Sequence, residues 1–218
     1  IFLRYANGQM LGVSLKAGSS ASKEPVLNTY VKPVFDFFGK PNDYLKLKQS
    51  LYPQYREAGV SELDIKTKWG SSKLAQDLGK FEKEDPKEYN RLYDINLALV
   101  KQAVIRLFNS DIKKTRKFIN EQILKTQLKT PFIKVKATMT TAYVDKMYDQ
   151  LSAGLQSATS IIASDPGGSK QDFNITLSDG ITLDMEFSAR SNKSGFEHKL
   201  GQFENLAIKF NAISGFRR

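Results

Sequence analysis

The sequence predicts a mixed fold of the α/β (α+β) class, with β-hairpins at both ends of the chain and helices between them. Asn7-Gly8 and Asp179-Gly180 are each flanked by alternating apolar residues, a pattern typical of tight hairpin turns. In the middle of the chain, apolar residues recur at the spacing of amphipathic helices. Because 40% of the 218 residues are hydrophobic, we expect a single domain over 1–218, with a helical lobe at about 40–130.

The first hairpin is expected over residues 1–17. Its strands would join around Asn7-Gly8, where a two-residue turn needs positive φ at both positions. Successive side chains of a strand point to opposite faces, so the second strand has one apolar face. Ser14 and Lys16 share its other face.

Three weaker patterns follow this hairpin. Residues 22–39 are expected to form a short helix that bends at Pro33 and stops at Gly39. A strand is predicted at 62–69 and a small helix at 71–83.

Asp85 begins the clearest helical pattern of the chain. It is a good N-cap, Pro86 suits the first helical position, and Glu88 could reach back to complete a capping box. The apolar face of this helix continues to Phe108, so we expect it in the core. A second helix is predicted over 111–127, with its isoleucines buried. The cations that it presents elsewhere are Lys113, Lys114, Arg116 and Lys117.

The last third of the chain is predicted to return to β-structure. A strand is expected over 131–137, followed by a long amphipathic helix over 140–164 that ends at Asp165-Pro166-Gly167-Gly168. The second hairpin then turns at Asp179-Gly180, and a helix or strand over 204–213 closes the fold.

The rare residue types exclude several kinds of chemistry. The chain has no cysteine, which rules out disulfides and cysteine zinc sites and indicates a reducing, intracellular and cytoplasmic location. His198 is the only histidine, so histidine triads and multi-histidine metal sites are excluded in practice. The groups that remain available for catalysis or ligand binding are carboxylates, lysines, hydroxyls and hard metal ions. Since no 18 consecutive residues are apolar, we expect no membrane partner.

The net charge of +10 is concentrated in one stretch of the chain. Residues 101–136 contain ten Lys or Arg and two acids, a density typical of proteins that bind nucleic acid. A solvated helix face is the alternative interpretation. A second basic group falls in one glycine-containing loop that could grip backbone phosphates, with an ordinary polar loop as its alternative. Its members are Arg190, Lys193, His198 and Lys199.

Ser14-Leu15-Lys16, at the end of an amphipathic hairpin, resembles the core motif of the PD-(D/E)XK nuclease superfamily. The resemblance implies a restriction-endonuclease-like mixed sheet with a helical inserted lobe, Mg²⁺ or Mn²⁺ as cofactor, and endonuclease hydrolysis of DNA. It assigns Lys16 to stabilising the developing charge or orienting the water, and Ser14 stands where the family has an acid. The family's Asp would be expected just upstream of Ile1, and Glu24 could be a migrated carboxylate.

Three functions are open on the sequence alone. The first is this metal-dependent DNA hydrolase, and the second is a non-enzymatic basic protein that binds or packages nucleic acid. The third is a scaffold whose charge serves solubility. Asp184 and Glu186 would share a strand face, but a solvated sheet surface accounts for them better than a catalytic carboxylate pair.

Overall fold

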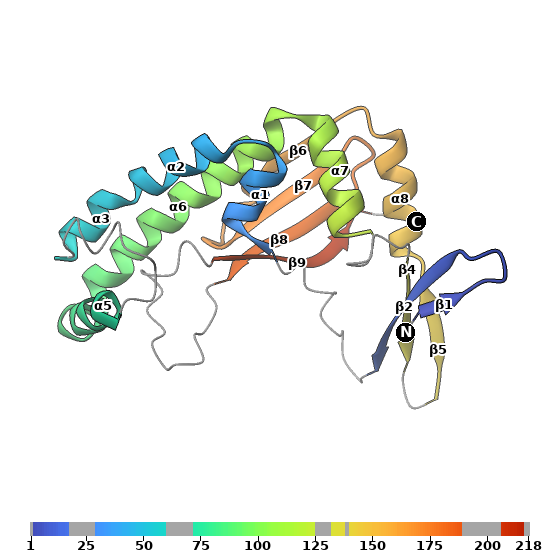
Figure 1. Cartoon of the computed structure of the whole chain (residues 1–218), viewed down its shortest axis with the longest axis horizontal. Coiled ribbons are helices and arrows are strands. Elements are labelled where there is room, and N and C mark those ends of the chain that lie inside the picture. The colour runs from blue at the N-terminus through green and yellow to red at the C-terminus, as the bar shows by residue number, and fades with distance from the viewer. Residues whose placement is uncertain are drawn as a thin grey trace.

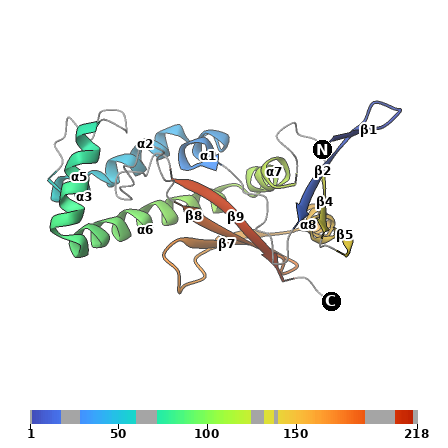
Figure 2. The same cartoon turned by 90° about the horizontal axis from the view of Figure 1, so that it is seen from below.

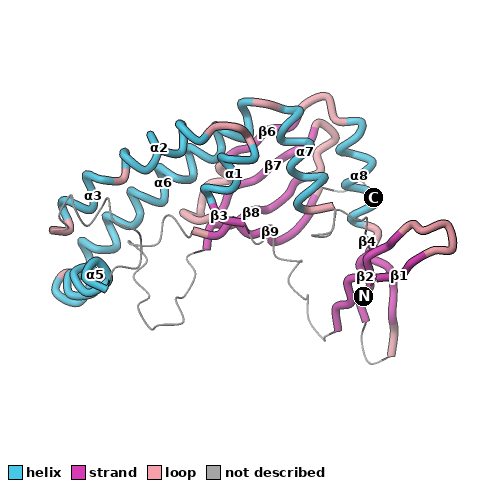
Figure 3. Tube along the Cα trace, in the orientation of Figure 1, coloured by secondary structure: helices cyan, strands magenta, loops and turns pink. Residues whose placement is uncertain are grey.

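The computed structural model describes residues 2–17, 29–59, 72–124, 132–137, 140–188 and 206–215, which form two β-sheets and a set of helices (Figure 1, Figure 3). The α+β class is confirmed. The strands are β1 (Phe2–Arg4), β2 (Met10–Ala17), β3 (Thr29–Tyr30), β4 (Phe132–Ala137), β5 (Ala142–Asp145), β6 (Ile161–Ser164), β7 (Asp172–Leu177), β8 (Thr182–Ser188) and β9 (Ala207–Ser214). The helices are α1 (Val31–Phe37), α2 (Pro41–Ser50), α3 (Tyr52–Glu57), α5 (Ser72–Glu84), α6 (Pro86–Ser110), α7 (Ile112–Gln122) and α8 (Met147–Ser157). None of the helices in these ranges is long and apolar enough to cross a membrane.

The larger sheet is antiparallel and has the strand order β3-β9-β8-β7-β6. Buried apolar residues alternate with partly buried polar residues along β7 and β8, so one face of this sheet belongs to the core. Figure 1 and Figure 2 show α1, α6 and α7 on one side of the sheet. These helices supply the other half of the core.

A cluster of phenylalanines joins the helices to the larger sheet. The ring of Phe108, on α6, lies 5.4 Å from that of Phe38 and 5.2 Å from that of Phe118, both edge-on. Phe108 also lies 6.0 Å from Phe173 of β7, which stacks on Phe187 of β8 at 5.0 Å. All five side chains are at most 2% exposed. Edge-to-face and offset contacts at these separations stabilise aromatic pairs beyond the area they bury.

The smaller sheet lies to one side of this core, with the strand order β1-β2-β4-β5 (Figure 1, Figure 2). Its outer pairs are antiparallel, whereas β2 and β4 run parallel. The connection between β2 and β4 contains α1 to α7.

Both predicted hairpins are confirmed, and they share one turn geometry. In the first hairpin, the amide of Tyr5 donates to the carbonyl of Gln9 at 2.8 Å. The amide of Gly8 donates to the carbonyl of Tyr5 at 2.9 Å. The hairpin of β7 and β8 repeats both bonds. Gly8 and Gly180 follow the two central turn residues with φ of +83° and +92°. Each turn is thus the longer hairpin loop with glycine at its left-handed position, rather than the two-residue turn expected.

Asp85 caps α6 as predicted. Its carboxylate accepts from the amide of Glu88 at 3.0 Å. The reciprocal half of the capping box is absent, because the amide of Asp85 already donates to the carbonyl of Phe81 at the end of α5. The Glu88 side chain instead pairs with Arg91.

The helix predicted over 22–39 is wrong in its first part. Thr29–Tyr30 form a strand that pairs with β9, and the helix begins only at Val31. Pro33 therefore lies in the first turn of α1, where no intrahelical donor is needed, and it causes no bend. The stop at Gly39 is confirmed, with φ of +67°.

The single helix predicted over 140–164 is also wrong. This segment forms β5, the shorter helix α8 and then β6. The cause is tertiary: β5 pairs with β4 and β6 pairs with β7, and such pairing overrides a local helical pattern. The turn at residues 165–168 is present, with φ of +75° at both glycines, but it ends a strand instead of a helix.

The remaining predictions stand as follows. The helix at 71–83 is confirmed as α5, and the strand at 131–137 as β4. The helix at 111–127 is confirmed as α7, although it ends earlier, and 204–213 contains the strand β9. The strand predicted at 62–69 lies outside the described residues.

A buried lysine fixes the turn between β6 and β7 to α6. The ammonium of Lys101, whose side chain is 7% exposed, lies 2.6 Å from the carboxylate of Asp165 and donates to the carbonyl of Ser169 at 3.1 Å. The hydrogen bond from Lys101 lowers the pKa of Asp165, with a smaller contribution from the amide of Gly167. The turn is therefore held by charge as well as by backbone geometry.

We predict that Lys101→Met lowers the free energy of unfolding by about 1–2 kcal/mol near neutral pH, because the charged hydrogen bonds are lost. The pKa of Asp165 is lowered in the folded chain, so its contribution is present above its unfolded pKa of about 3.9 and is lost as the pH falls through the folded value. The difference between wild type and variant should therefore shrink in acid. Denaturant titrations at pH 7 and at pH 3 measure this.

Lys170→Met is the matched control for this prediction. Lys170 pairs with Asp94 in the same region, but its side chain is 70% exposed, so its loss should change the free energy of unfolding little. Equal losses for Lys101→Met at both pH values would contradict the charged role of Lys101.

Candidate functional site

The register of β2 against β4 brings the predicted catalytic residues beside two further lysines. Ser14 is paired with Lys134, and Lys16 is paired with Lys136. On the far side of β4, Lys134 is paired with Asp145 of β5. Paired residues of neighbouring strands share a face, so these residues belong to one surface of the smaller sheet.

We call this surface the basic sheet face. It consists of Ser14, Lys16, Lys134, Lys136, Tyr143 and Asp145. Tyr143, the register partner of Lys136, is 55% exposed. By strand register, three lysines, one aspartate, one serine and the exposed Tyr143 thus occupy positions on one face at this end of the sheet. Toward the other end of β2, the same face contains Phe2, Arg4, Met10, Gly12 and Phe132.

Alternation along the strands produces this surface. The sequence Phe132-Ile133-Lys134-Val135-Lys136 places aliphatic and cationic residues on opposite faces, and β2 does the same. The opposite face therefore contains no charged residue. Its members are Leu3, Leu11, Val13, Leu15, Ala17, Ile133, Val135, Ala137, Ala142 and Val144.

The basic sheet face lies where parallel strands end. Lys16 and Lys136 are each the penultimate residue of β2 and β4, which run in the same direction. Sheets with parallel strands commonly bind ligands at the carboxyl ends of those strands. The position is thus suited to a ligand, and the residue types are suited to an anion.

The strand register assigns few magnesium ligands to the basic sheet face. Mg²⁺ is held in proteins by carboxylate oxygens together with water or substrate phosphates. Asp145 is the one carboxylate that the register assigns to this face, and the described part of the chain has no group of three or more acids or histidines that could hold a metal. Glu24 lies outside the described residues.

Two of the four cations predicted on α7 have structural roles. The ammonium of Lys114 donates to the carbonyl of Phe38 at 2.6 Å, at the C-terminal end of α1. The guanidinium of Arg116 donates to the carbonyls of Gln156 and Ala158, at the C-terminal end of α8. Cations at these ends satisfy orphan carbonyls and oppose the partial negative charge of the helix.

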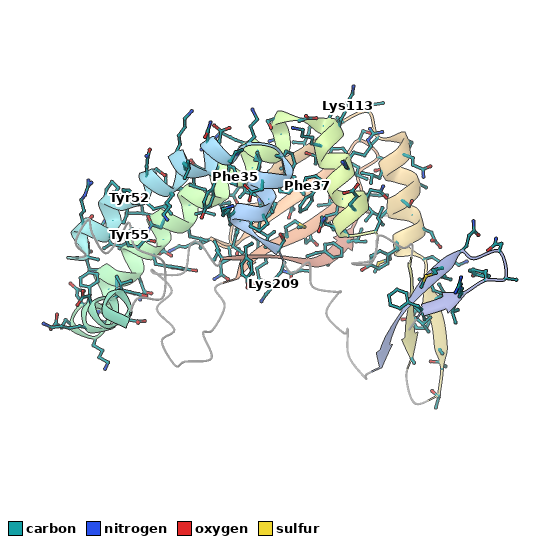
Figure 4. All side chains as sticks on the ribbon, in the orientation of Figure 1. Phe35, Phe37, Tyr52, Tyr55, Lys113 and Lys209 are labelled. Atoms are coloured by element: carbon teal, nitrogen blue, oxygen red, sulfur yellow. The ribbon has the colours of Figure 1, made fainter. Side chains whose placement is uncertain are left out.

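The other two predicted cations of α7 are exposed. Lys117 lies 4.0 Å from Glu121 and 5.9 Å from the ring centre of Phe37, with its side chain 64% exposed. Lys113 has no hydrogen-bond or ion-pair partner among the described residues. Figure 4 shows it near the top of the molecule, above Phe37. Lys113 and Lys117 therefore keep their charge available to a ligand.

The predicted basic loop cannot be placed. Arg190, Lys193, His198 and Lys199 all lie outside the described residues.

The carboxylates of the second hairpin lie on the polar face of the larger sheet. Burial raises the pKa of Asp184, with a smaller contribution from Asp172. The side chain of Glu186 accepts a hydrogen bond from Asn211 at 3.0 Å. These acids are partly shielded sheet residues, in keeping with the structural interpretation of the pattern.

Sequence reasoning missed that Lys134, Lys136, Tyr143 and Asp145 accompany Ser14 and Lys16. The sequence of 131–137 shows alternating aliphatic and cationic residues. It does not identify the strand that pairs with this segment, because β2 and β4 are separated by more than a hundred residues.

We predict that Lys114→Met and Arg116→Met each lower the free energy of unfolding by about 1–2 kcal/mol, because helix-end carbonyls lose a charged donor. Lys113→Met, on the same helix, should change it by less than about 0.5 kcal/mol, since Lys113 has no partner there. Thermal and denaturant unfolding of the three variants measures this difference. Equal effects at Lys113 and Lys114 would contradict the capping role.

The chain matches no protein-family model, no curated protein and no solved structure. Its function must therefore be inferred from the residues of the basic sheet face and of α7 themselves.

Proposed function

We propose that this chain binds DNA through the basic sheet face. The observation that carries the proposal is the register of β2 against β4, which pairs Lys16 directly with Lys136 and sets Lys134 beside them. Neighbouring strands lie about 5 Å apart, and like charges directly opposite each other destabilise a sheet. A phosphate backbone lying across these lysines removes that repulsion and releases counterions.

The neighbouring residues suit the same ligand. Tyr143 is 55% exposed beside Lys136, and an exposed aromatic ring can stack on an unpaired base. Ser14 can donate to a phosphate oxygen. The net charge of +10 attracts a polyanion to the chain as a whole. The basic sheet face would determine where on the chain the polyanion binds.

Phosphodiester hydrolysis is the second candidate function. The observation that favours it is Asp145, a carboxylate that the register assigns to the face of Ser14 and Lys16. This is the combination of residue types that the resemblance to PD-(D/E)XK nucleases implies, with a single acid where that family has more. We place DNA binding first because the three lysines of the basic sheet face support it directly, whereas hydrolysis depends on this single acid.

We predict that the triple variant Lys16→Gln, Lys134→Gln, Lys136→Gln binds duplex DNA more weakly and with less dependence on salt. Each lost phosphate contact should reduce the slope of log Kobs against log salt by about 0.9. Fluorescence anisotropy with a labelled duplex over a range of salt concentrations measures the slope, and circular dichroism checks that the variant is folded.

The matched control for this variant removes the same charge elsewhere. Lys40, Lys83 and Lys87 are exposed residues beside or within α2, α5 and α6, and their replacement by Gln should leave most of the slope intact. If the control loses as much of the slope as the sheet variant, binding depends on net charge alone and the sheet is not the site.

The second candidate predicts that duplex DNA is cut in the presence of Mg²⁺ or Mn²⁺ and left intact with a chelator. Lys16→Met should then reduce the rate at least about 100-fold, because a group that stabilises the developing charge is lost. Asp145→Asn should also reduce it, whereas Lys83→Met should not. An absence of metal-dependent cutting, with salt-sensitive binding retained, would exclude hydrolysis and leave the binding function.

A further inference from the structure

A basic groove lies between α7 and α8. Its volume is about 260 Å³. Its lining residues are Lys113, Arg116, Lys117, Asn120 and Leu124 from α7 and the turn after it, and Ser152, Leu155 and Gln156 from α8. The α7 residues recur at three- and four-residue intervals, so they lie along one side of the helix. One wall is therefore cationic and the other is neutral and polar.

Arg116 is held in place at the base of the cationic wall. Its guanidinium donates to the carbonyls of Gln156 and Ala158, which fixes it against the end of α8. A guanidinium has five N–H donors, so donors remain for a ligand after these two bonds. Because its geometry is already set, a ligand need not order this side chain on binding.

Lys113 and Lys117 stand four residues apart on the same wall, one helical turn from each other. Lys113 has no partner among the described residues, and the carboxylate of Glu121 is 4.0 Å from Lys117. None of the described residues that line the groove is acidic. Glu121 and the carbonyls at the end of α8 therefore offset only part of the positive charge of the groove.

The floor of the groove is apolar. Leu155 is 3% exposed and belongs to the core, and Leu124 packs against that core. Ser152 and Gln156, one turn apart on α8, offer neutral donors and acceptors at the opposite edge. A ligand for this groove therefore needs an anionic group at one end and a flat or apolar body with polar edges at the other.

We propose that the α7–α8 groove binds a nucleotide phosphate, with the phosphate at Lys113, Arg116 and Lys117 and the base or sugar over Leu124 and Leu155. The volume lies just below the usual range of about 300–1,000 Å³ for small-molecule sites, so the groove suits one small ligand rather than a duplex. The ligand is a free nucleotide or the phosphorylated end of a strand, which share this chemistry. This site goes beyond the function proposed for the basic sheet face and uses none of its residues.

Calorimetric titration with deoxyadenosine monophosphate, deoxyadenosine and inorganic phosphate tests the proposal. The monophosphate should bind more tightly than either of the other two, because it alone supplies both the anion and the apolar body. Lys113→Gln with Lys117→Gln should weaken binding of the monophosphate at least about tenfold. Both lysines are exposed, so this variant should stay folded, which its melting temperature checks. Lys40→Gln with Lys87→Gln is the control of equal charge.

Two further ligands identify the source of the phosphate. A six-nucleotide strand with a 5′-phosphate that binds better than the same strand with a 5′-hydroxyl indicates a strand end, and equal binding of the two indicates a free nucleotide. No binding of the monophosphate at millimolar concentration, or binding unchanged in the lysine variant, would overturn the proposal. The sheet variant that lacks Lys16, Lys134 and Lys136 should keep this binding, so failure of one site is distinguishable from failure of the other.

Discussion

The packing of Phe108 against Phe38, Phe118 and Phe173 is the contact on which the rest of the structure depends. It joins α6, the end of α1, α7 and β7 at one point, and each ring is at most 2% exposed. Substitution of a buried phenylalanine by alanine typically costs about 3–5 kcal/mol, because a cavity remains where the ring was. The orientation of α7, and with it the side of the helix that carries its cations, follows from the ring of Phe118, which α7 inserts here.

That orientation explains why basic residues of α7 have different roles. With Phe118 and Ile119 in the core, the helix can direct Lys114 to the end of α1 and Arg116 to the end of α8. The linear sequence shows four nearly adjacent cations and no distinction among them. The distinction arises because helix ends expose carbonyls that need donors, and only two of the cations meet such ends. A dense basic segment can therefore stabilise a fold as well as bind a partner.

The parts of the fold that could be predicted are those encoded locally. Asp85 and Pro86 identify the start of α6, and Gly8 and Gly180 identify both hairpins, because caps and turns depend on a few consecutive residues. The helix predicted over 140–164 was wrong because the strands β5 and β6 in this segment form only through pairing with β4 and β7. The prediction of the candidate site was incomplete for the same reason. The sequence identified Ser14 and Lys16, but their neighbours come from a parallel strand far along the chain, and a local pattern does not encode that pairing.

The helix α8 links the basic sheet face to the basic groove. It begins directly after β5 and ends at the carbonyls that Arg116 caps. Its own position depends on Gly154, since a Cβ there would lie 2.5 Å from the carboxylate of Asp179 and 2.8 Å from the side chain of Ile181. A larger residue at this position would force the ends of these two side chains to move. The position of α8 relative to α7 and to the larger sheet is therefore influenced by the small residue Gly154 and by the Arg116 cap, and Arg116 also lines the groove where we propose that a phosphate binds.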